Sequence, residues 1–238
     1  MGLFDWFRRK DQAVQTVKAN HIGAVTEMVK PDHPEQPLEM VRPVAKVTDP
    51  ISKKAPTLIT LDQLRRGLGI SREMADKWDD WLNEAMFLWG IKERLDVACF
   101  LAQVGHESAG LRYSKEIWGN TRAQLRYEGR RDLGNTVKGD GKRFMGRGPI
   151  QITGRANYRK VTQWIRKVVP DAPDFEAKPH LLELPRWGSL AAGAFWKWNN
   201  LSELGRQGAI TKITRIVNGG YNGLADRKKR FNQLLNVL

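Results

Sequence analysis

The segment from Leu95 to Glu107, LDVACFLAQVGHE, constrains the fold most strongly, because it is apolar on nearly every face of a helix. A helix of that kind has to be surrounded by other elements, since it has no polar face to turn toward water. It ends in a histidine and a glutamate. The sequence therefore predicts a central, buried helix that carries an ionisable residue, Glu107, at its end.

Several other segments have the apolar spacing of helices that would cover this one. A capping box at Thr60 to Gln63 opens a short helix, which we expect Gly67 and Gly69 to end. Steps of three and four between apolar residues indicate further helices within residues 71–89, 158–168, 190–198, 213–217 and 231–238. In the first of these, the spacing places Trp81 on the apolar face, which we expect to be buried. Residues 128–153 are glycine-rich and predict loops with a small hairpin around Phe144 to Ile152. The expected fold class is mainly α.

The chain divides into three parts by composition. Residues 31–57 hold six of the eleven prolines without a sustained helical or strand period, and they predict an extended linker. Residues 1–30 predict an amphipathic helix after a cap at Asp11, preceded by an aromatic and basic start that could lie on a membrane surface or pack on the main domain. Residues 58–238 are expected to form the main domain.

Charge narrows the class of partner. The formal net charge is +14, and residues 58–238 hold 31 Lys and Arg against 19 Asp and Glu. Such an excess favours a polyanion, which could be nucleic acid, anionic lipid, lipopolysaccharide or the acidic wall of a bacterium. From Arg126 to Lys160 alone there are ten Lys and Arg against three acidic residues, a local charge that would suit phosphate or acidic glycan unless it is only a solvated loop.

Cysteine and histidine usage argues against a cofactor or metal. Cys99 is the only cysteine, so an internal disulfide and a cysteine-based zinc cluster are excluded, and its apolar surroundings predict a core residue. The four histidines show no ligand-like spacing, and we expect His106 to fix the end of its helix. The start MGLFDWFRRKD lacks the apolar stretch of a signal peptide, so we expect synthesis in a reducing cytoplasm and export by another route.

Carboxyl groups are the candidates for chemistry. A glutamate such as Glu107, partly desolvated at the end of a buried helix, has a raised pKa and can donate a proton near neutral pH. The alternative is a salt bridge, which is the commoner role for a lone glutamate at a helix end. A glycosidase needs a second carboxylate, and both Glu116 and Glu128 follow within a loop region. Trp118 and Tyr127 lie in the same region and could stack on sugar rings or belong to the core.

The segment Gly139 to Tyr158, GDGKRFMGRGPIQITGRANY, combines glycines with short polar side chains. The glycines indicate sharp turns or a close approach of the backbone to another group. Gln151, Thr153 and Asn157 supply amide and hydroxyl groups that suit sugar hydroxyls and acetamides.

Four motifs together resemble glycoside hydrolase family 19, which contains chitinases and many bacteriophage endolysins. They are AQVGHESAG, the paired Glu107 and Glu116, GRGPIQITGRANY and NGGYNGLADR, and the resemblance runs from about Thr60 to the C-terminus. It implies a lysozyme-like, two-lobed, mainly helical domain with a cleft between the lobes. It also implies metal-free hydrolysis of β-1,4 bonds in polymers of N-acetylated amino sugars, with inversion at the anomeric carbon.

The resemblance also implies roles for individual residues. Glu107 takes the place of the general acid, and Glu116 that of the base, with Glu128 in reserve. Sugar contacts are implied for Gln151, Thr153, Asn157 and Asn218, and Arg227 takes the place of the arginine that orients the carboxylates. Asn222 stands where plant enzymes usually have a glutamate, so the way in which the base is held should differ here.

Three hypotheses follow. The first is a peptidoglycan-degrading endolysin, a monomer without cofactor that reaches the cell wall in the periplasm after a separate protein permeabilises the membrane. Its basic surface could also bind the anionic envelope, and no specific nucleic acid is expected. The second is a chitinase acting on N-acetylglucosamine polymers. The third is a non-enzymatic basic protein that binds nucleic acid or envelope, with affinity that falls steeply with salt.

Overall fold

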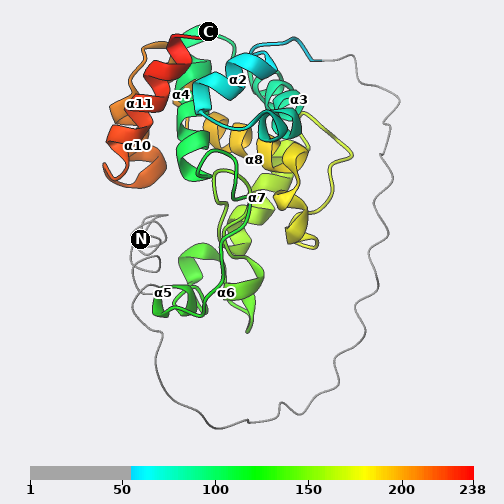
Figure 1. Cartoon of the computed structure of the whole chain (residues 1–238). Helices are drawn as coiled ribbons and strands as arrows, with labels where there is room; N and C mark the ends of the chain where they lie inside the picture. The colour runs from blue at the N-terminus through cyan, green and yellow to red at the C-terminus, as the bar shows by residue number, and fades with distance from the viewer. Residues whose placement is uncertain (1–54) are drawn as a thin grey trace. The chain divides into compact units, whose positions relative to one another are not determined.

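Helix α4 (Arg94–Glu107) is enclosed by other helices in the part of the chain that the structure describes, residues 55–238 of a computed structural model (Figure 1). Eleven of its fourteen residues are buried, so the predicted central helix is confirmed. The predicted helix of residues 1–30 and the linker up to residue 54 lie outside the described residues. The other elements are α2 (Leu61–Leu68), α3 (Arg72–Trp89), α5 (Arg122–Leu125), η1 (Arg131–Leu133), α6 (Asp140–Arg143), α7 (Arg155–Ile165), η2 (Pro179–Glu183), α8 (Pro185–Trp198), α9 (Leu201–Arg206), α10 (Ile210–Asn218) and α11 (Leu224–Leu235).

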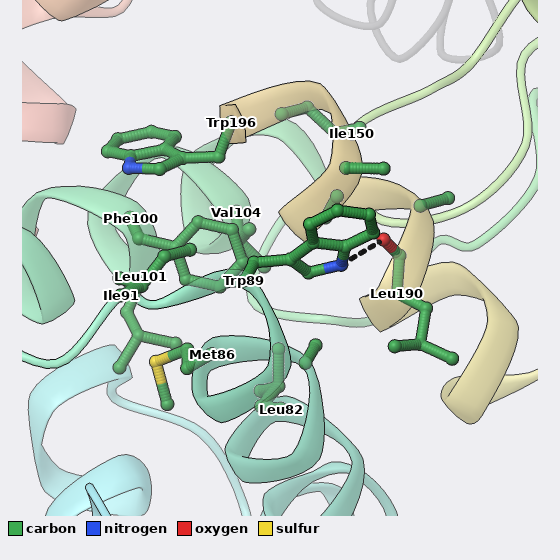
Figure 2. Close-up of a cluster of buried hydrophobic side chains, with 14 of the residues drawn as sticks. Leu82, Met86, Trp89, Ile91, Phe100, Leu101, Val104, Ile150, Leu190 and Trp196 are labelled. Atoms are coloured by element: carbon green, nitrogen blue, oxygen red, sulfur yellow. Dashed lines mark hydrogen bonds between the residues drawn. The ribbon is translucent and has the colours of Figure 1, made fainter. Parts of the chain in front are cut away.

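Aromatic side chains join α3, α4 and α8 into one core (Figure 2). The indole Nε1 of Trp89 donates to the carbonyl of Leu190 at 3.0 Å. Gly193 permits this approach, since a Cβ at that position would lie 2.1 Å from the ring of Trp89. Phe100 meets Trp196 edge-on with ring centroids 5.4 Å apart. Burying one such side chain is worth about 1.5–3 kcal/mol, so this contact region is a main source of stability.

Capping residues set the ends of the first helices as the sequence predicts. The hydroxyl of Thr60 accepts from the backbone of Gln63, whose side chain returns to the backbone of Thr60, and this confirms the capping box. At the start of α3 the hydroxyl of Ser71 accepts from the backbone of Met74, without a reciprocal side-chain bond. Gly90 ends α3 with a φ of 74°, a left-handed conformation that glycine adopts without strain.

Two expectations about the outer helices are wrong. Gly67 does not help to end α2 but lies inside it, where a Cβ would stand 2.5 Å from Leu234 on α11. This glycine is therefore a contact point between α2 and α11. Trp81, placed by its spacing on the buried face of α3, is 39% exposed, and the guanidinium of Arg186 lies 5.9 Å from its ring centroid.

Residues 111–154 carry only short elements, and α5 and α6 lie at the end opposite α2 and α11 in Figure 1. Residues 55–238 contain no strand, so the expected hairpin is reduced to one bridged pair, Arg147 and Ile152. The backbone of Gln151 donates to Gly148 at 3.0 Å, so the four residues between the bridged pair form a tight turn. Within the same described range, none of the helices is long and apolar enough to cross a membrane.

Candidate active site

Glu107 is the last residue of α4, and its side chain is 1% exposed. Nη2 of Arg227 on α11 donates to Oε1 of this carboxyl at 2.5 Å, whereas Oε2 has no hydrogen-bond partner among the described residues. The sequence places the carboxyl where the core opens, but the structure encloses it more fully. Burial raises the pKa of Glu107, and the charge and hydrogen bond of Arg227 oppose that rise.

His106 ties the end of α4 to the start of α11, as expected of a structural histidine. Its Nδ1 lies 2.7 Å from Oδ2 of Asp226, and Nε of Arg230 donates to the same oxygen at 2.8 Å. The two partners hold the pKa of Asp226 well below its usual range, with the hydrogen bond from His106 as the largest cause. These bonds thus fix the position of His106, the residue next to the candidate acid.

Helices α4 and α10 run in the same direction. A Cβ built on Gly208, just before α10, would lie 3.8 Å from the side chain of Leu95 near the start of α4. Further along both helices, Nε2 of Gln103 donates to the hydroxyl of Thr214 at 3.1 Å. Asn218 follows one turn later at the end of α10, as Glu107 does at the end of α4.

Asn218 is 2% exposed and is held by the loop that follows it. Its Nδ2 donates to the carbonyl of Asn222 at 2.7 Å, and its Oδ1 has no partner in residues 55–238. Asn222 therefore contributes its backbone at the position where plant enzymes usually carry a glutamate. The unpaired oxygen of Asn218 is suited to accept a hydrogen bond from a ligand.

A left-handed turn leads from Glu107 toward the next candidate. Ala109, Gly110 and Leu111 have φ values of 51°, 71° and 63°. The buried hydroxyl of Ser108 stabilises this turn, since it donates to Val104 at 2.7 Å and accepts from the backbone of Leu111 at 2.8 Å. The direction in which the chain leaves the candidate acid is therefore fixed by a side chain next to it.

Glu116 is a second buried carboxyl, 4% exposed. Its Oε1 accepts from Nε2 of Gln124 and its Oε2 from the backbone of Gly146, both at 3.1 Å. Burial raises the pKa of Glu116, while these two donors and the side chain of Tyr127 act to lower it. The carboxyl is both desolvated and well supplied with hydrogen-bond donors.

Glu128, the reserve candidate, is engaged with the backbone. Its Oε1 accepts from the N–H of Gly139 at 2.5 Å and its Oε2 from the N–H of Gly141 at 2.8 Å. Gly141 has no space for a side chain, because a Cβ would lie 2.8 Å from Oε2 of Glu128. Both oxygens of Glu128 therefore stabilise the loop around α6.

Gly146 brings two of the predicted sugar-binding residues close to Glu116. A Cβ on Gly146 would lie 2.6 Å from Oε1 of Gln151 and 3.3 Å from Oγ1 of Thr153, while the backbone of Gly146 binds Glu116. Gln151 has a left-handed φ of 56°, and its Nε2 donates to Gly148 at 3.0 Å. Asn157 follows on α7, where its Nδ2 donates to the carbonyl of Thr153 at 2.7 Å.

Trp118 and Tyr127 form an aromatic pair beside this carboxyl. Their ring centroids are 6.3 Å apart, and both side chains are half-buried. Nε1 of Trp118 donates to Asn120 at 2.6 Å, and the side chain of Tyr127 hydrogen bonds with Glu116. The pair therefore lies next to the candidate base, where a sugar ring could stack.

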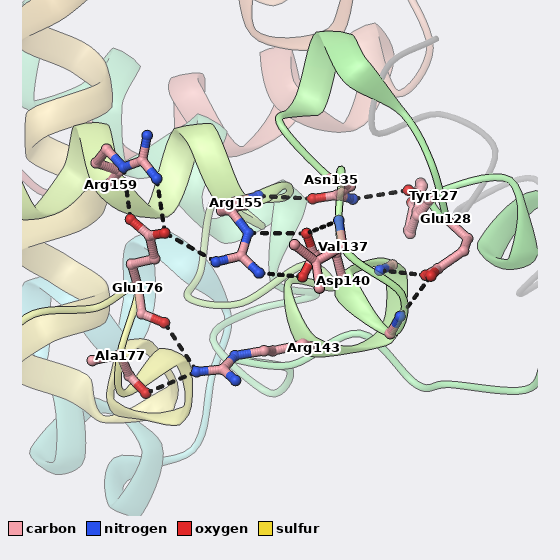
Figure 3. Close-up of polar contacts among 12 residues, drawn as sticks. Tyr127, Glu128, Asn135, Val137, Asp140, Arg143, Arg155, Arg159, Glu176 and Ala177 are labelled. Carbon is pink, nitrogen blue, oxygen red and sulfur yellow. Dashed lines mark hydrogen bonds and ion pairs between the residues drawn. The ribbon is translucent and has the colours of Figure 1, made fainter.

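Much of the basic stretch 126–160 is neutralised internally. Figure 3 shows Arg155 between Asp140 and Glu176, with Arg159 on the same glutamate. Arg147 likewise pairs with Glu183 at 2.7 Å. Arg130 and Arg143 also have partners within the domain. Four of the ten basic residues of the stretch are therefore ion-paired within the domain, and Arg143 is bound to carbonyl oxygens.

Sequence reasoning missed two polar residues beneath Glu107. Gln103 and Thr214 are both fully buried, and Gln103 accepts a hydrogen bond from Arg227. A lone amide one turn before Glu107 in an otherwise apolar run was the signal that could have identified Gln103. Cys99, in the same helix, is buried with its pKa raised to about 12 by desolvation, consistent with a core residue. Among residues 55–238 no cluster of three or more His, Cys, Asp or Glu could hold a metal ion.

Comparison with known proteins adds sequence relatives. No family model matches the sequence. The chain is 30% identical over 175 residues to a glycosyl hydrolase family 19 domain-containing protein of Haemophilus influenzae, a match that covers 61% of this chain and 82% of the relative. It is also 31% identical over 134 residues to an endochitinase of Arabidopsis thaliana, and this match covers 55% of the chain but only 42% of the plant protein.

Solved structures share the fold. Chitinase C from Streptomyces griseus HUT6037 is similar with a TM-score of 0.55 and 20% identity over 76% of each chain. A bacterial family 19 chitinase has a TM-score of 0.57 and 17% identity over 76% of this chain and 94% of its own. These likenesses confirm the expected lysozyme-like, mainly helical fold. Since the chain covers most of a Haemophilus relative that is 30% identical to it, it belongs to glycosyl hydrolase family 19 and is a glycoside hydrolase.

Proposed function

We propose that the protein is an endolysin that hydrolyses β-1,4 glycosidic bonds of bacterial peptidoglycan by an inverting mechanism, with Glu107 as the acid and Glu116 as the base. The observation that carries this assignment is the contrast between two buried carboxyls. Glu107 keeps one oxygen without a partner among the described residues, whereas both oxygens of Glu116 accept hydrogen bonds.

Glu107 fits the acid because its surroundings favour a proton on one oxygen. Burial raises its pKa, so the protonated form persists to higher pH than in water. Arg227 occupies Oε1 and has only N–H groups to offer, so a proton on the carboxyl belongs on Oε2. That oxygen can then donate to the leaving glycosidic oxygen.

Glu116 fits the base because it is held as an acceptor. The backbone of Gly146 and the amide of Gln124 donate to it and stabilise the ionised form against the cost of burial. An ionised carboxylate can take a proton from the water that attacks the anomeric carbon on the face opposite the leaving group. Gln151, Thr153, Asn157 and Asn218 would hold the sugar, and Trp118 with Tyr127 would stack on a ring.

Charge supports the wall as the substrate. Residues 58–238 carry an excess of 12 positive charges, 31 against 19, and ion pairs within the domain leave this net charge unchanged. Peptidoglycan is acidic and chitin is neutral, so this field attracts the first and not the second. We further propose that the enzyme acts on the wall in the periplasm, as a monomer, after synthesis in the cytoplasm and permeabilisation of the membrane.

The chitinase alternative is favoured by a different observation, the presence of an endochitinase and of chitinases among the similar proteins. Both hypotheses use the same chemistry and differ in the substituents of the polymer. The non-enzymatic hypothesis is not retained, because the chain is a glycoside hydrolase and four of the ten basic residues on which the hypothesis relied are ion-paired within the domain.

The test compares the native chain with Glu107→Gln on two substrates. We expect native protein to clear suspensions of purified Gram-negative peptidoglycan, to release products of inverted configuration seen by ¹H NMR, and to turn over soluble chitin oligomers slowly. Glu107→Gln should lose about a hundredfold or more in rate. Fast turnover of chitin oligomers with intact peptidoglycan would favour the chitinase, and equal clearance by both proteins would refute Glu107 as the acid.

A further inference from the structure

A buried chain of hydrogen bonds leads from α10 through α4 to Glu107. Oγ1 of Thr214 donates to the carbonyl of Ile210 at 2.7 Å and accepts from Nε2 of Gln103 at 3.1 Å. Oε1 of Gln103 accepts from Nη1 of Arg227, whose Nη2 donates to Glu107 at 2.5 Å. All four residues of this hydrogen-bond chain are at most 1% exposed, so water does not compete for these bonds.

The donors and acceptors of this hydrogen-bond chain can be arranged in only one order. The hydroxyl of Thr214 gives its single proton to Ile210, so its oxygen is left to accept from the amide nitrogen of Gln103. A guanidinium has no acceptor, so Arg227 requires the amide oxygen of Gln103 on its side. The two ends demand the same orientation of the amide, and a flip would break both bonds at once.

This arrangement fixes the guanidinium of Arg227. One terminal nitrogen is bound to Gln103 and the other to Glu107, while Nε has no partner among the described residues. A buried charge with few partners is sensitive to each of them, since an unmade bond in a low-dielectric interior is costly. The position of Arg227 over Oε1 of Glu107 therefore depends on Gln103.

We propose that Gln103 and Thr214 are positioning residues that hold Arg227 on Oε1 of Glu107 and so select Oε2 as the oxygen that carries the catalytic proton. This inference rests on the proposed role of Glu107 as the acid. Neither residue is expected to touch the substrate, because both lie fully buried beneath the carboxyl.

The remaining charges near Glu107 are accounted for. Arg227 on α11 and the adjacent His106 are the groups whose charge acts on it. His106 is paired with Asp226, which Arg230 also holds. From α10, Thr214 and Asn218 are buried and uncharged, whereas Lys212 and Arg215 are exposed. A change at Gln103 or Thr214 should therefore reach Glu107 through Arg227.

Two isosteric variants test the chain in the full-length protein. Thr214→Val removes the acceptor of the Gln103 amide nitrogen and leaves that buried N–H group without a partner, so Gln103 can shift and hold Arg227 less firmly, and kcat should fall about ten- to a hundredfold with KM unchanged. Thr214→Ser keeps the hydroxyl and should behave as the native enzyme. Gln103→Glu places a second carboxylate against Arg227, and the alkaline limb of the pH profile should move up by about one pH unit.

Thr162→Val is the matched control. Thr162 on α7 is also buried, donates to the carbonyl of Tyr158 at 3.1 Å and accepts from the backbone of Phe175 at 2.9 Å, but it has no link to Glu107. Its loss should lower the melting temperature about as much as Thr214→Val does. It should leave kcat, KM and the pH profile unchanged.

A readout that needs no turnover separates this inference from the proposed function. The titration of Glu107 is followed by ¹³C NMR of labelled glutamate carboxyls, with Glu107→Gln as the assignment reference. We expect its midpoint to rise in folded Gln103→Glu. If the midpoint does not move in Gln103→Glu and Thr214→Val keeps the native kcat, the inference is overturned. Should one of the two variants not fold, the result for the other decides. Full activity of Glu107→Gln would instead overturn the proposed acid.

Discussion

Gly223 lies directly against the imidazole of His106, since a Cβ built on it would stand 2.2 Å from both Cε1 and Nε2 of the ring. Gly223 is the residue before α11, and His106 precedes Glu107 on α4. The absence of a side chain at this one position therefore lets the start of α11 approach the end of α4 that carries the candidate acid.

Replacing Gly223 by alanine should destabilise the protein more than the same change at Gly219. Both residues have left-handed backbone, with φ of 66° and 69°, but no atom lies within 4 Å of a Cβ at Gly219. The strain of the backbone costs about 1–2 kcal/mol in either variant, and the clash adds about 1–3 kcal/mol at Gly223. Urea unfolding measures the difference, and equal losses would show that His106 moves aside freely.

Activity should follow a bell-shaped dependence on pH. Glu116 has to be ionised and Glu107 protonated, so the rate rises through the pKa of Glu116 and falls through that of Glu107. Burial raises the pKa of both, and both limbs should therefore lie above the ordinary range of a glutamate, about 4.3. Profiles of kcat/KM on peptidoglycan measure this. The residual activity of Glu107→Gln should lack the alkaline limb. A profile of this variant that keeps the alkaline limb would contradict the assignment of Glu107 as the acid.

Glu116→Gln and Glu128→Gln should affect different properties. The first removes the proposed base and should lower kcat by about 10²–10⁴-fold while the protein stays folded. The second weakens the bonds to Gly139 and Gly141, so it should lower the melting temperature with kcat within a few-fold of native. Paired kinetics and thermal unfolding decide, and loss of turnover in folded Glu128→Gln would make the reserve candidate the base.

Asp96 should make stability depend on pH. It is 1% exposed, and desolvation raises its pKa although Trp196 donates to it at 2.9 Å. A carboxyl whose folded pKa is raised stabilises the fold while protonated, and this contribution is lost as pH rises from the unfolded value, about 3.9, through the folded one. The free energy of unfolding of Asp96→Asn should therefore increase relative to that of the native protein as the pH rises from about 4 to 7. A constant difference in urea unfolding would contradict this.

The helices could be predicted where a local cap and an apolar period coincide. Thr60, Ser71 and Gly90 have their signals within three residues in sequence, so the start of α2 and both ends of α3 follow from short-range chemistry. Gly67 could not be assigned in this way. Its role depends on Leu234, which lies far along the chain and has no trace in the local pattern.

The candidate site divides along the same line. Glu107 could be placed because the apolar run of α4 ends there. The support beneath it could not, because Gln103 meets Thr214 and Arg227 only after three helices have packed. The choice between Glu116 and Glu128 was open for a similar reason, since the amides that bind each carboxyl come from later loops.

The common direction of α4 and α10 has an electrostatic consequence. The dipole of each helix places roughly half a negative charge at its C-terminal end, and these ends lie at Glu107 and Asn218. Two negative dipole ends disfavour an ionised carboxylate at Glu107 and favour positive charge beside it. A sugar ring that loses its leaving group develops positive charge in the transition state. The ends of α4 and α10 thus favour positive charge beside Glu107 independently of the side chains.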